Sequence, residues 1–267
     1  MSVFNSPVPG AAPVISGNAI SVSGLRKEYG PLKAVDGISF EVRQDEIFGL
    51  LGPNGAGKTT SVEILEGLRS ADGGEVTVAG VDVLRQPQRV KELIGVQLQA
   101  SAFLDNLNLV ELIDMFAALY GQKVDPLAML DRVDLREKAR AMVKNLSGGQ
   151  KQRFSIATAL VNNPRVLFLD EPSTGLDPQA RRNLWDLIES LRDGSRAIVL
   201  TTHYMEEAER LCDRVAIMDS GRIVSMGTPA ELIQQLLMKG FHKERIEAAA
   251  NLEDVFIDLT GKDLRED

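Results

Sequence analysis

A glycine-rich segment that ends in a lysine and a threonine has the composition of a phosphate-binding loop. It runs from Gly52 to Thr59 and follows the apolar stretch Ile47–Leu51, which predicts a buried strand. Glycine tolerates positive φ, so successive backbone N–H groups can converge on one anion, and a helix that begins near Lys58 adds its N-terminus. The pattern G-x-x-x-x-G-K-T between strand and helix therefore predicts nucleoside triphosphate binding; a glycine-rich turn without a ligand is the alternative.

The side chains of this loop have separate expected roles. Lys58 is expected to reach the β- and γ-phosphates as a point charge, and the Thr59 hydroxyl is expected to coordinate Mg²⁺. The predicted nucleotide contacts in and beside the loop are Gly52, Pro53, Asn54, Gly55, Ala56, Gly57, Lys58, Thr59 and Thr60.

Two carboxylates follow a second apolar strand farther along the chain. Val166–Leu169 is wholly apolar and leads into Asp170 and Glu171. Since ligands of open parallel sheets collect at the carboxyl ends of the strands, we expect Asp170 to hold Mg²⁺ through water. Glu171 can orient a water molecule and accept its proton, which predicts hydrolysis rather than binding alone. A helix cap or a solvated turn is the alternative explanation for an isolated acidic pair.

A third motif specifies the kind of protein. Leu146–Gln150 reads Leu-Ser-Gly-Gly-Gln and precedes a helix expected over Gln150–Leu160. Exposed glycine amides and a serine hydroxyl at a helix N-terminus bind anions, and Ser147 is also a good N-cap. With the glycine-rich loop before this motif and the acidic strand end after it, the chain resembles the ATP-binding (ATPase) subunit of an ABC transporter from about Ala19 onward.

This resemblance implies a head-to-tail dimer of two copies of the chain. In the family, the Ser-Gly-Gly surface of one subunit completes the γ-phosphate site of the other, and ATP holds the interface together until it is hydrolysed. The residues expected to contact the nucleotide of the partner copy are Ser147, Gly148, Gly149, Gln150 and Asp177.

The resemblance assigns three further residues. Tyr29 corresponds to the aromatic residue that stacks on adenine, and a half-exposed strand tyrosine is the alternative. Gln99 corresponds to the glutamine that contacts Mg²⁺ and the attacking water, although Leu98 stands where many relatives have proline and Gln97 is a second glutamine nearby. His203 corresponds to the switch histidine at the γ-phosphate. The expected catalytic residues are Glu171, His203 and Gln99, and the expected metal ligands are Thr59, Asp170 and Gln99.

Strands that alternate with helices predict the elements that position these residues. We expect an α/β fold with a P-loop NTPase (RecA-like) core, whose mostly parallel sheet is covered on both faces. Alternation over Ile20–Val42 predicts an antiparallel β subdomain with a turn at Asp36-Gly37. Further buried strands are expected at Val166–Leu169 and Ala197–Leu200, and a hairpin turn at Asp219–Gly221.

The chain is expected to divide into three parts. A disordered leader covers residues 1–17, the ABC ATPase domain covers 18–228, and a helical tail covers 229–267. Helical patterns at Leu107–Tyr120 and from Pro126 belong to an α-helical subdomain inserted at about residues 100–161.

Composition excludes several classes of function. The 267 residues carry 30 basic and 38 acidic side chains, a net charge of −8, so no nucleic-acid partner is expected. No apolar run approaches the roughly 18 residues of a membrane-spanning helix, and a secretory signal is not expected. The single cysteine fits a reducing compartment. A subunit of this kind is therefore expected at the cytoplasmic face of the membrane, peripheral and bound to a separate transmembrane permease.

The C-terminal run favours an exporter. Asn251–Gly261 resembles the ending of ATPases that drive drug, lipid or polysaccharide exporters, as does the stretch Asp105–Asn108. Apolar residues between Ser101 and Leu109 suit either contact with a permease helix or core packing. An importer ATPase and an ABC ATPase without a transport role are the alternatives. P-loop kinases and GTPases do not need Leu-Ser-Gly-Gly-Gln, and Glu171 argues against a purely regulatory binding module.

Overall fold

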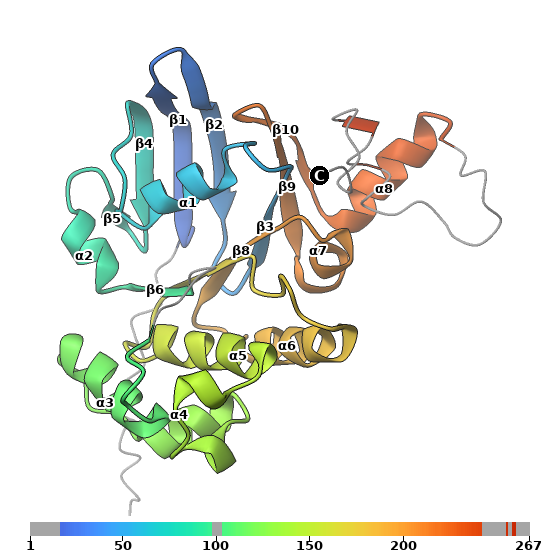
Figure 1. Cartoon of the computed structure of the whole chain (residues 1–267). Helices are drawn as coiled ribbons and strands as arrows, with labels where there is room; N and C mark the ends of the chain where they lie inside the picture. The colour runs from blue at the N-terminus through green and yellow to red at the C-terminus, as the bar shows by residue number, and fades with distance from the viewer. Residues whose placement is uncertain (1–16, 98–102, 242–254, 256–257, 260–267) are drawn as a thin grey trace, which may run out of the picture.

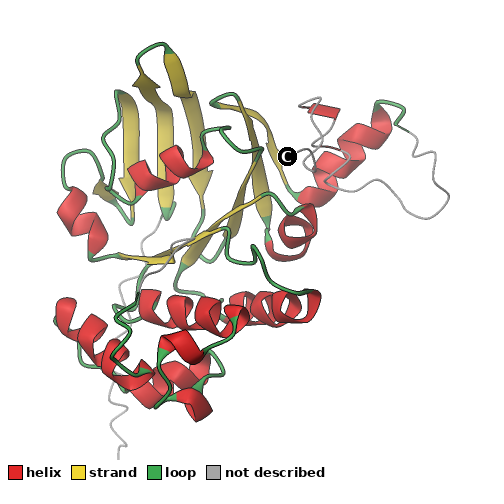
Figure 2. Cartoon of the chain, viewed as in Figure 1, coloured by secondary structure: helices red, strands yellow, loops and turns green. Residues whose placement is uncertain are grey.

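The computed structural model describes residues 17–97, 103–241, 255, 258 and 259 (Figure 1). These residues form two sheets with a layer of helices below them in the view of Figure 2. The predicted α/β class is confirmed, with a mostly parallel sheet, an antiparallel sheet and helices. Gln99, the tail residues Leu252 and Phe256, and the expected leader before Gly17 lie outside the described residues.

The first sheet is antiparallel and has the strand order β2-β1-β4-β5. Its strands are β1 (Ile20–Tyr29), β2 (Leu32–Val42), β4 (Gly73–Val78) and β5 (Val81–Asp82). Along β2 the side chains of Ile38, Phe40 and Val42 are buried and alternate with exposed ones, as the period of two predicts. This sheet places Tyr29, the last residue of β1, beside the glycine-rich loop.

The turn predicted at Asp36-Gly37 is wrong. The chain reverses at Gly30-Pro31 instead, and Asp36 and Gly37 lie inside β2. Between Leu25 and Arg26 the pairing of β1 with β2 shifts, so Gly37 has no partner in the register and adopts a φ of 76°. An unpaired glycine with positive φ makes a bulge, and a bulge uses the same residue types as a turn. Asp36 is held there by Arg222, whose Nη2 lies 2.6 Å from its carboxylate.

The second sheet has the strand order β10-β9-β3-β8-β7-β6. Its strands are β3 (Ile47–Leu51), β6 (Ile94–Gln97), β7 (Val166–Asp170), β8 (Ala197–Thr202), β9 (Arg214–Asp219) and β10 (Arg222–Gly227). All neighbours pair in parallel except β9 and β10, which form the predicted hairpin. Because parallel strands end at the same edge, the glycine-rich loop after β3 and the acidic end of β7 lie on either side of β8.

Helices cover both faces of the parallel sheet. They are α1 (Lys58–Leu65), α2 (Pro87–Lys91), α3 (Leu109–Leu119), α4 (Pro126–Arg132), α5 (Gly148–Ala159), α6 (Pro178–Ser190), α7 (Met205–Leu211) and α8 (Pro229–Met238), with short 3₁₀ segments at Arg136–Lys138 and Val143–Asn145. None of the helices that the described residues form is long and apolar enough to cross a bilayer.

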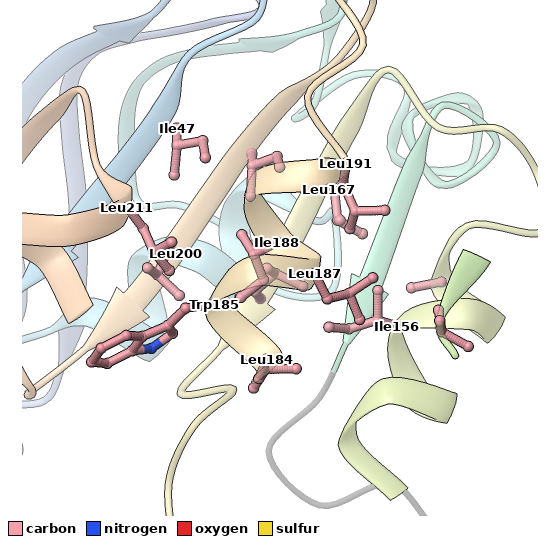
Figure 3. Close-up of a cluster of buried hydrophobic side chains, with 14 of the residues drawn as sticks. Ile47, Ile156, Leu167, Leu184, Trp185, Leu187, Ile188, Leu191, Leu200 and Leu211 are labelled. Carbon is pink, nitrogen blue, oxygen red and sulfur yellow. The ribbon is translucent and has the colours of Figure 1, made fainter. Parts of the chain in front are cut away.

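Two apolar clusters hold these layers together. The first lies between the two sheets and includes the stacked rings of Phe40 and Phe48, whose centroids are 5.3 Å apart. The second lies between the parallel sheet and the helices α3 to α7, and Figure 3 shows part of it around Trp185 and Leu200. Val255 and Leu259 of the tail also pack against this second cluster. Burial on both faces explains why the central strands are apolar throughout.

Close packing of α5 on β6 depends on one glycine. A Cβ atom built on Gly95 would lie 2.0 Å from the carbonyl oxygen of Ala159, near the end of α5. Gln97 strengthens the same contact, because its Nε2 donates to Gln152 Oε1 at 3.1 Å. The helix that begins with the Ser-Gly-Gly motif is therefore fixed to the edge strand of the parallel sheet.

Replacing Gly95 with alanine should destabilise the fold. The added methyl group must displace backbone, and overpacking of this kind costs about 1–3 kcal/mol. A fall of the thermal midpoint by at least about 2 °C is expected for a chain of this size. Gly73→Ala is the matched control, because its Cβ would meet Arg26 at an ordinary 3.8 Å. Equal midpoints for the two variants would contradict the close contact.

Candidate functional site

The glycine-rich loop is shaped by residues that need positive φ or close backbone approach. Gly55 and Gly57 have φ values of 79° and 101°, which L side chains rarely adopt. A Cβ atom on Gly57 would lie 2.2 Å from Ala34 O, so the loop touches β2 through backbone alone. The Ala56 N–H closes the loop on Pro53 O at 3.1 Å.

Two other parts of the chain brace the loop from outside. The Gly221 N–H, in the turn between β9 and β10, donates to Ala56 O at 3.0 Å. Gly221 O in turn accepts from the Asp36 N–H of the β2 bulge at 2.8 Å. A Cβ atom on Gly52 would lie 2.3 Å from Met218 O of β9. The loop conformation is therefore set before any ligand binds.

Lys58 carries a buried positive charge inside this loop. Its side chain is 5% exposed, and its Nζ donates to Gly52 O at 2.7 Å and to Pro53 O at 3.2 Å. Burial lowers the pKa of Lys58, while the negative charges of Glu171 and Asp170 act in the opposite direction. The loop and the acidic strand end thus form one electrostatic unit.

The acidic strand end is held by Thr201 of the neighbouring strand β8. The Thr201 hydroxyl donates to Asp170 Oδ1. The Glu171 N–H donates to both oxygens of Thr201, each at 3.1 Å. Glu171 has a φ of 47°, a left-handed conformation that costs a non-glycine residue about 1 kcal/mol or more and is maintained by such contacts.

Glu171 faces His203 across the site. Glu171 Oε1 lies 3.3 Å from His203 Nδ1, and Glu171 Oε2 accepts a hydrogen bond from the Thr174 hydroxyl at 3.2 Å. The His203 contact lowers the pKa of Glu171 and outweighs the opposing effect of burial; Lys58 and Thr174 lower it further. Glu171 is therefore a carboxylate at neutral pH and available to accept a hydrogen bond from water.

A cavity of about 620 Å³ brings the separate motifs together. It is lined by Tyr29, Leu32, Ala34, Asn54, Gly55, Ala56, Gly57, Lys58, Thr59, Thr60, Glu171, Thr174 and His203. Of the predicted nucleotide contacts, Gly52 and Pro53 do not line this cavity but provide the carbonyl oxygens that hold Lys58.

Oxygen donors suited to Mg²⁺ are found in the cavity lining and at the end of a neighbouring strand. The exposed Thr59 is part of its lining, and Asp170 ends the adjacent strand β7. Oxygen ligands of this kind fit Mg²⁺, which keeps several waters and takes phosphate oxygens. The described part of the chain contains no group of three or more His, Cys, Asp or Glu side chains that could hold a metal by themselves.

Tyr29 lines the cavity and is 41% exposed. The Arg69 guanidinium donates to the Tyr29 hydroxyl and lies 5.5 Å from the ring centroid. The Lys27 ammonium also lies 5.5 Å from this centroid. Glu63 holds Arg69 at 2.6 Å. The ring is thus fixed in place while part of its surface is free to stack.

The Leu146–Gln150 motif, here called the signature segment, lies apart from the cavity of its own chain. In Figure 1 its helix α5 belongs to the lower helical layer, whereas α1 follows the phosphate loop on the other side of the parallel sheet. Ser147 and Gly148 are exposed. Ser147 Oγ accepts from Gln150 N at 3.3 Å, and Gln150 Oε1 accepts from Ser147 N at 3.0 Å, which makes a capping box. The N-cap alternative for Ser147 is confirmed, and it leaves the Gly148 amide at the surface.

Asp177 also caps a helix. Its Oδ1 accepts from the backbone N–H groups of Gln179 and Ala180 at 3.0 and 2.9 Å, at the start of α6. Gly149 packs against this start, because a Cβ atom there would lie 3.1 Å from Ala180 Cβ. The predicted trans contacts Ser147, Gly148, Gly149, Gln150 and Asp177 thus belong to two adjoining helix N-termini.

The apolar residues after the glutamine segment are divided between core and surface. Phe103 packs its ring against Phe116 and Phe154, and Leu109 is fully buried. Leu104 is 52% exposed. Core packing therefore accounts for part of this segment, and contact with a permease helix stays a prediction.

Sequence reasoning did not identify Thr174 and Thr201 as site residues. Both donate hydrogen bonds to the carboxylates. Thr174 follows Glu171 by three residues, whereas the strand order places Thr201 beside Asp170. The pair of threonines directly before His203 was the available signal, since residues at the end of a neighbouring parallel strand lie beside Asp170.

The chain matches a family model described as ABC transporter over residues 35–174. It is 41% identical to the Nod factor export ATP-binding protein I of Ralstonia nicotianae over 232 residues, which cover 85% of this chain and 71% of that protein. It is also 41% identical to a daunorubicin resistance ATP-binding protein of Streptomyces coeruleorubidus, over 80% of this chain and 69% of that protein.

A solved structure of the ATP-binding subunit of an ABC transporter superposes with a TM-score of 0.77 at 25% identity, covering 90% of this chain and 99% of that one. A dimeric ATP-binding cassette in a post-hydrolysis state with ADP and phosphate has the same fold, with a TM-score of 0.70 at 22% identity over 78% of this chain and 98% of that one. The phosphate loop, the acidic strand end and the signature helix agree with these similarities. The chain therefore belongs to the ABC transporter family, as one of its ATP-binding and ATP-hydrolysing subunits.

Proposed function

We propose that this chain powers the export of a drug-like, lipid or polysaccharide cargo through a separate membrane permease. Relatives named for Nod factor export and for daunorubicin resistance carry this proposal, since the similarity extends over most of the chain. The cargo contacts the permease, so the nucleotide site carries no information about its identity.

In this proposal the phosphates of ATP occupy the loop from Gly52 to Thr59 and adenine stacks on Tyr29. The ammonium of Lys58 contacts the β- and γ-phosphates, and the loop amides and the N-terminus of α1 hold the remaining charge. Thr59, Asp170 and Gln99 hold Mg²⁺, which when bound neutralises phosphate oxygens. The support is the rigid loop and the cavity that joins it to Tyr29.

Hydrolysis is assigned to Glu171 with His203 and Gln99. Glu171 orients the attacking water and takes its proton, because its carboxylate is ionised and points into the cavity. His203, 3.3 Å away, fixes that carboxylate and contacts the γ-phosphate. The Thr174 hydroxyl donates to the second oxygen of Glu171 and so helps to orient the carboxylate toward the water.

Two copies of the chain complete each site in a head-to-tail dimer. The surface formed by Ser147, Gly148, Gly149, Gln150 and Asp177 is then placed against the γ-phosphate in the partner copy. The exposure of Ser147 and Gly148 at a helix N-terminus, away from the cavity of the same chain, supports this assignment. Attachment to the permease keeps the pair at the cytoplasmic face of the membrane.

Glu171→Gln should retain ATP binding and lose hydrolysis. Glutamine keeps the shape of the side chain but is a poor base, and loss of a general base lowers the rate by about 10²–10⁴-fold. ATP should then hold a long-lived dimer, visible by light scattering with ATP and absent without it. A variant that stays monomeric, or that hydrolyses ATP at the wild-type rate, would contradict the assigned roles.

Two inactive variants should restore each other if the sites are shared. Lys58→Ala removes the phosphate contact, and Gly148→Asp places a charge at the signature surface, where a side chain meets only Leu176 at an ordinary 3.7 Å. A heterodimer of the two has one intact site, so an equal mixture should recover about a quarter of the wild-type rate.

Lys123→Ala is the control for removal of a lysine. Lys123 is exposed and outside the cavity, so this variant should hydrolyse ATP at the wild-type rate without a second variant. Binding measured by calorimetry should fall about tenfold or more in Lys58→Ala, from loss of a charged hydrogen bond. A mixture of Lys58→Ala and Gly148→Asp that stays inactive, although each variant is folded, would show that the signature surface does not act across the dimer.

The export proposal predicts a membrane partner. The intact chain, purified under mild detergent from its own membranes, should carry with it a polytopic membrane protein without an ATP-binding domain. Vesicles that contain the pair should move cargo away from the side that bears the ATPase, and the Glu171→Gln pair should not. Copurification with soluble proteins only, or transport toward the ATPase side, would contradict the export assignment.

A further inference from the structure

A carboxyl group lies fully buried in the helical layer, away from the nucleotide cavity. Glu207, on α7, has a relative exposure of 0%. Burial of an acidic side chain is costly unless hydrogen bonds compensate, so such a residue is uncommon without a role. Burial is the main cause of the raised pKa of Glu207, which the neighbouring hydroxyl and indole groups oppose in part.

The partners of Glu207 come from three other elements. The indole Nε1 of Trp185, on α6, donates to Glu207 Oε1 at 2.9 Å. The hydroxyl groups of Thr202 and Ser173 lie beside the carboxyl and lower its pKa by hydrogen bonding. Ser173 Oγ and Glu207 Oε2 are both buried, and neither makes a hydrogen bond of regular geometry. The positive charge of Arg181, also on α6, lowers the pKa of Glu207 further.

Two of these partners belong to the segments that carry the catalytic groups. Ser173 follows Glu171 by two residues, and Thr202 directly precedes His203. The Thr202 hydroxyl also accepts from Tyr204 N at 3.0 Å, which fixes the backbone around the histidine. One carboxyl group therefore touches the loop after β7 and the end of β8 at once.

A second contact runs parallel to the first. The Arg181 guanidinium lies 4.5 Å from the ring centroid of Tyr204, and the rings of Tyr204 and His203 are 4.2 Å apart. The start of α6, close to Asp177, is thus connected with the histidine. Glu207 and Arg181 together join α6, α7 and both catalytic segments.

Simple packing does not account for Glu207. Its partner Trp185 lies in an apolar cluster beside Leu200 and Leu211 (Figure 3). In such surroundings an apolar side chain of similar size often stabilises a fold as well as or better than a buried polar group. A polar group that contacts two catalytic segments is therefore explained better by what it positions.

We propose that Glu207 is a positioning residue for ATP hydrolysis, which holds the Ser173 and Thr202 segments at the spacing that keeps His203 Nδ1 3.3 Å from Glu171. The inference rests on the catalytic roles proposed above for Glu171 and His203. Glu207 touches neither nucleotide nor water in this scheme, and its effect is confined to the geometry of the two groups that do.

The first test separates hydrolysis from binding in the full-length chain. Glu207→Ala should lower kcat about tenfold or more, since displacement of a catalytic group by about 1 Å costs up to about 100-fold. The Kd for ATP should stay within about twofold, because the phosphate loop is braced by β2 and the β9–β10 turn instead. Glu207→Gln keeps an acceptor oxygen and should recover kcat to within about threefold of wild type.

Glu206→Ala is the matched control, since Glu206 is exposed on the same helix and should leave both constants unchanged. Wild-type kcat in folded Glu207→Ala would overturn the proposal. So would equal losses of kcat in the Ala and Gln variants, which would indicate a role in stability alone. An inactive Glu171→Gln with a fully active Glu207→Ala would overturn only the positioning role, whereas a fully active Glu171→Gln would overturn the catalytic assignment itself.

The second test does not depend on the alanine variant's turnover. Trp185 is the single tryptophan of the chain, so its fluorescence reports on the group that its indole contacts. In the Glu171→Gln chain, addition of ATP should change this emission, because the catalytic segments move against Glu207. The change should persist in the Glu171→Gln, Glu207→Gln double variant, which keeps the acceptor oxygen, and disappear in the Glu171→Gln, Glu207→Ala double variant. No response in the Glu171→Gln chain, despite ATP binding by calorimetry, would overturn the connection.

Discussion

The buried ammonium group of Lys58 is the charge around which the site is built. A cation with 5% exposure is stable only where acceptors replace water, and two loop carbonyls do so within 3.2 Å. Asp170 and Glu171, across β8, add negative charge that favours the protonated amine. This arrangement requires β3, β8 and β7 to end at one edge in parallel, and hence the crossover helices that a parallel sheet needs.

A rigid loop follows from the same constraint. The loop can present its amides to phosphate only if its own backbone is held elsewhere. Ala34 of β2 holds it from one side, and Met218 and Gly221 of the β9–β10 hairpin hold it from another. Each contact is made by backbone, which is why glycine stands at the points of closest approach. The antiparallel sheet and the β9–β10 hairpin thus support the loop in addition to enclosing the core.

Sequence patterns predicted the parts of the site that depend on local chemistry. The strand, loop and helix around Lys58 and the acidic end of β7 were identified because apolar runs and glycine spacing are local signals. Asp36-Gly37 was misassigned because a bulge and a turn use the same residues, and only pairing with β1 separates them. The contact of Trp185 with Glu207 joins α6 and α7 through residues that are 22 positions apart in sequence, and no local pattern specifies it.

The two kinds of site element differ in what holds them. The phosphate loop, Glu171 and His203 are fixed by contacts within one chain. The Ser147–Gln150 segment is capped and is exposed at Ser147 and Gly148, and its helix is anchored from behind by contacts such as Gly149 on Ala180 and Gln97 on Gln152. An exposed helix N-terminus of this kind can bind an anion, and the proposed dimer would place the γ-phosphate of a second copy there. Glu207 lies between α6, whose N-terminus adjoins α5, and the segments that carry Glu171 and His203. The proposed partner surface and the proposed catalytic groups therefore share one framework. This shared framework is the physical route by which the proposed dimer contact would affect the proposed hydrolysis.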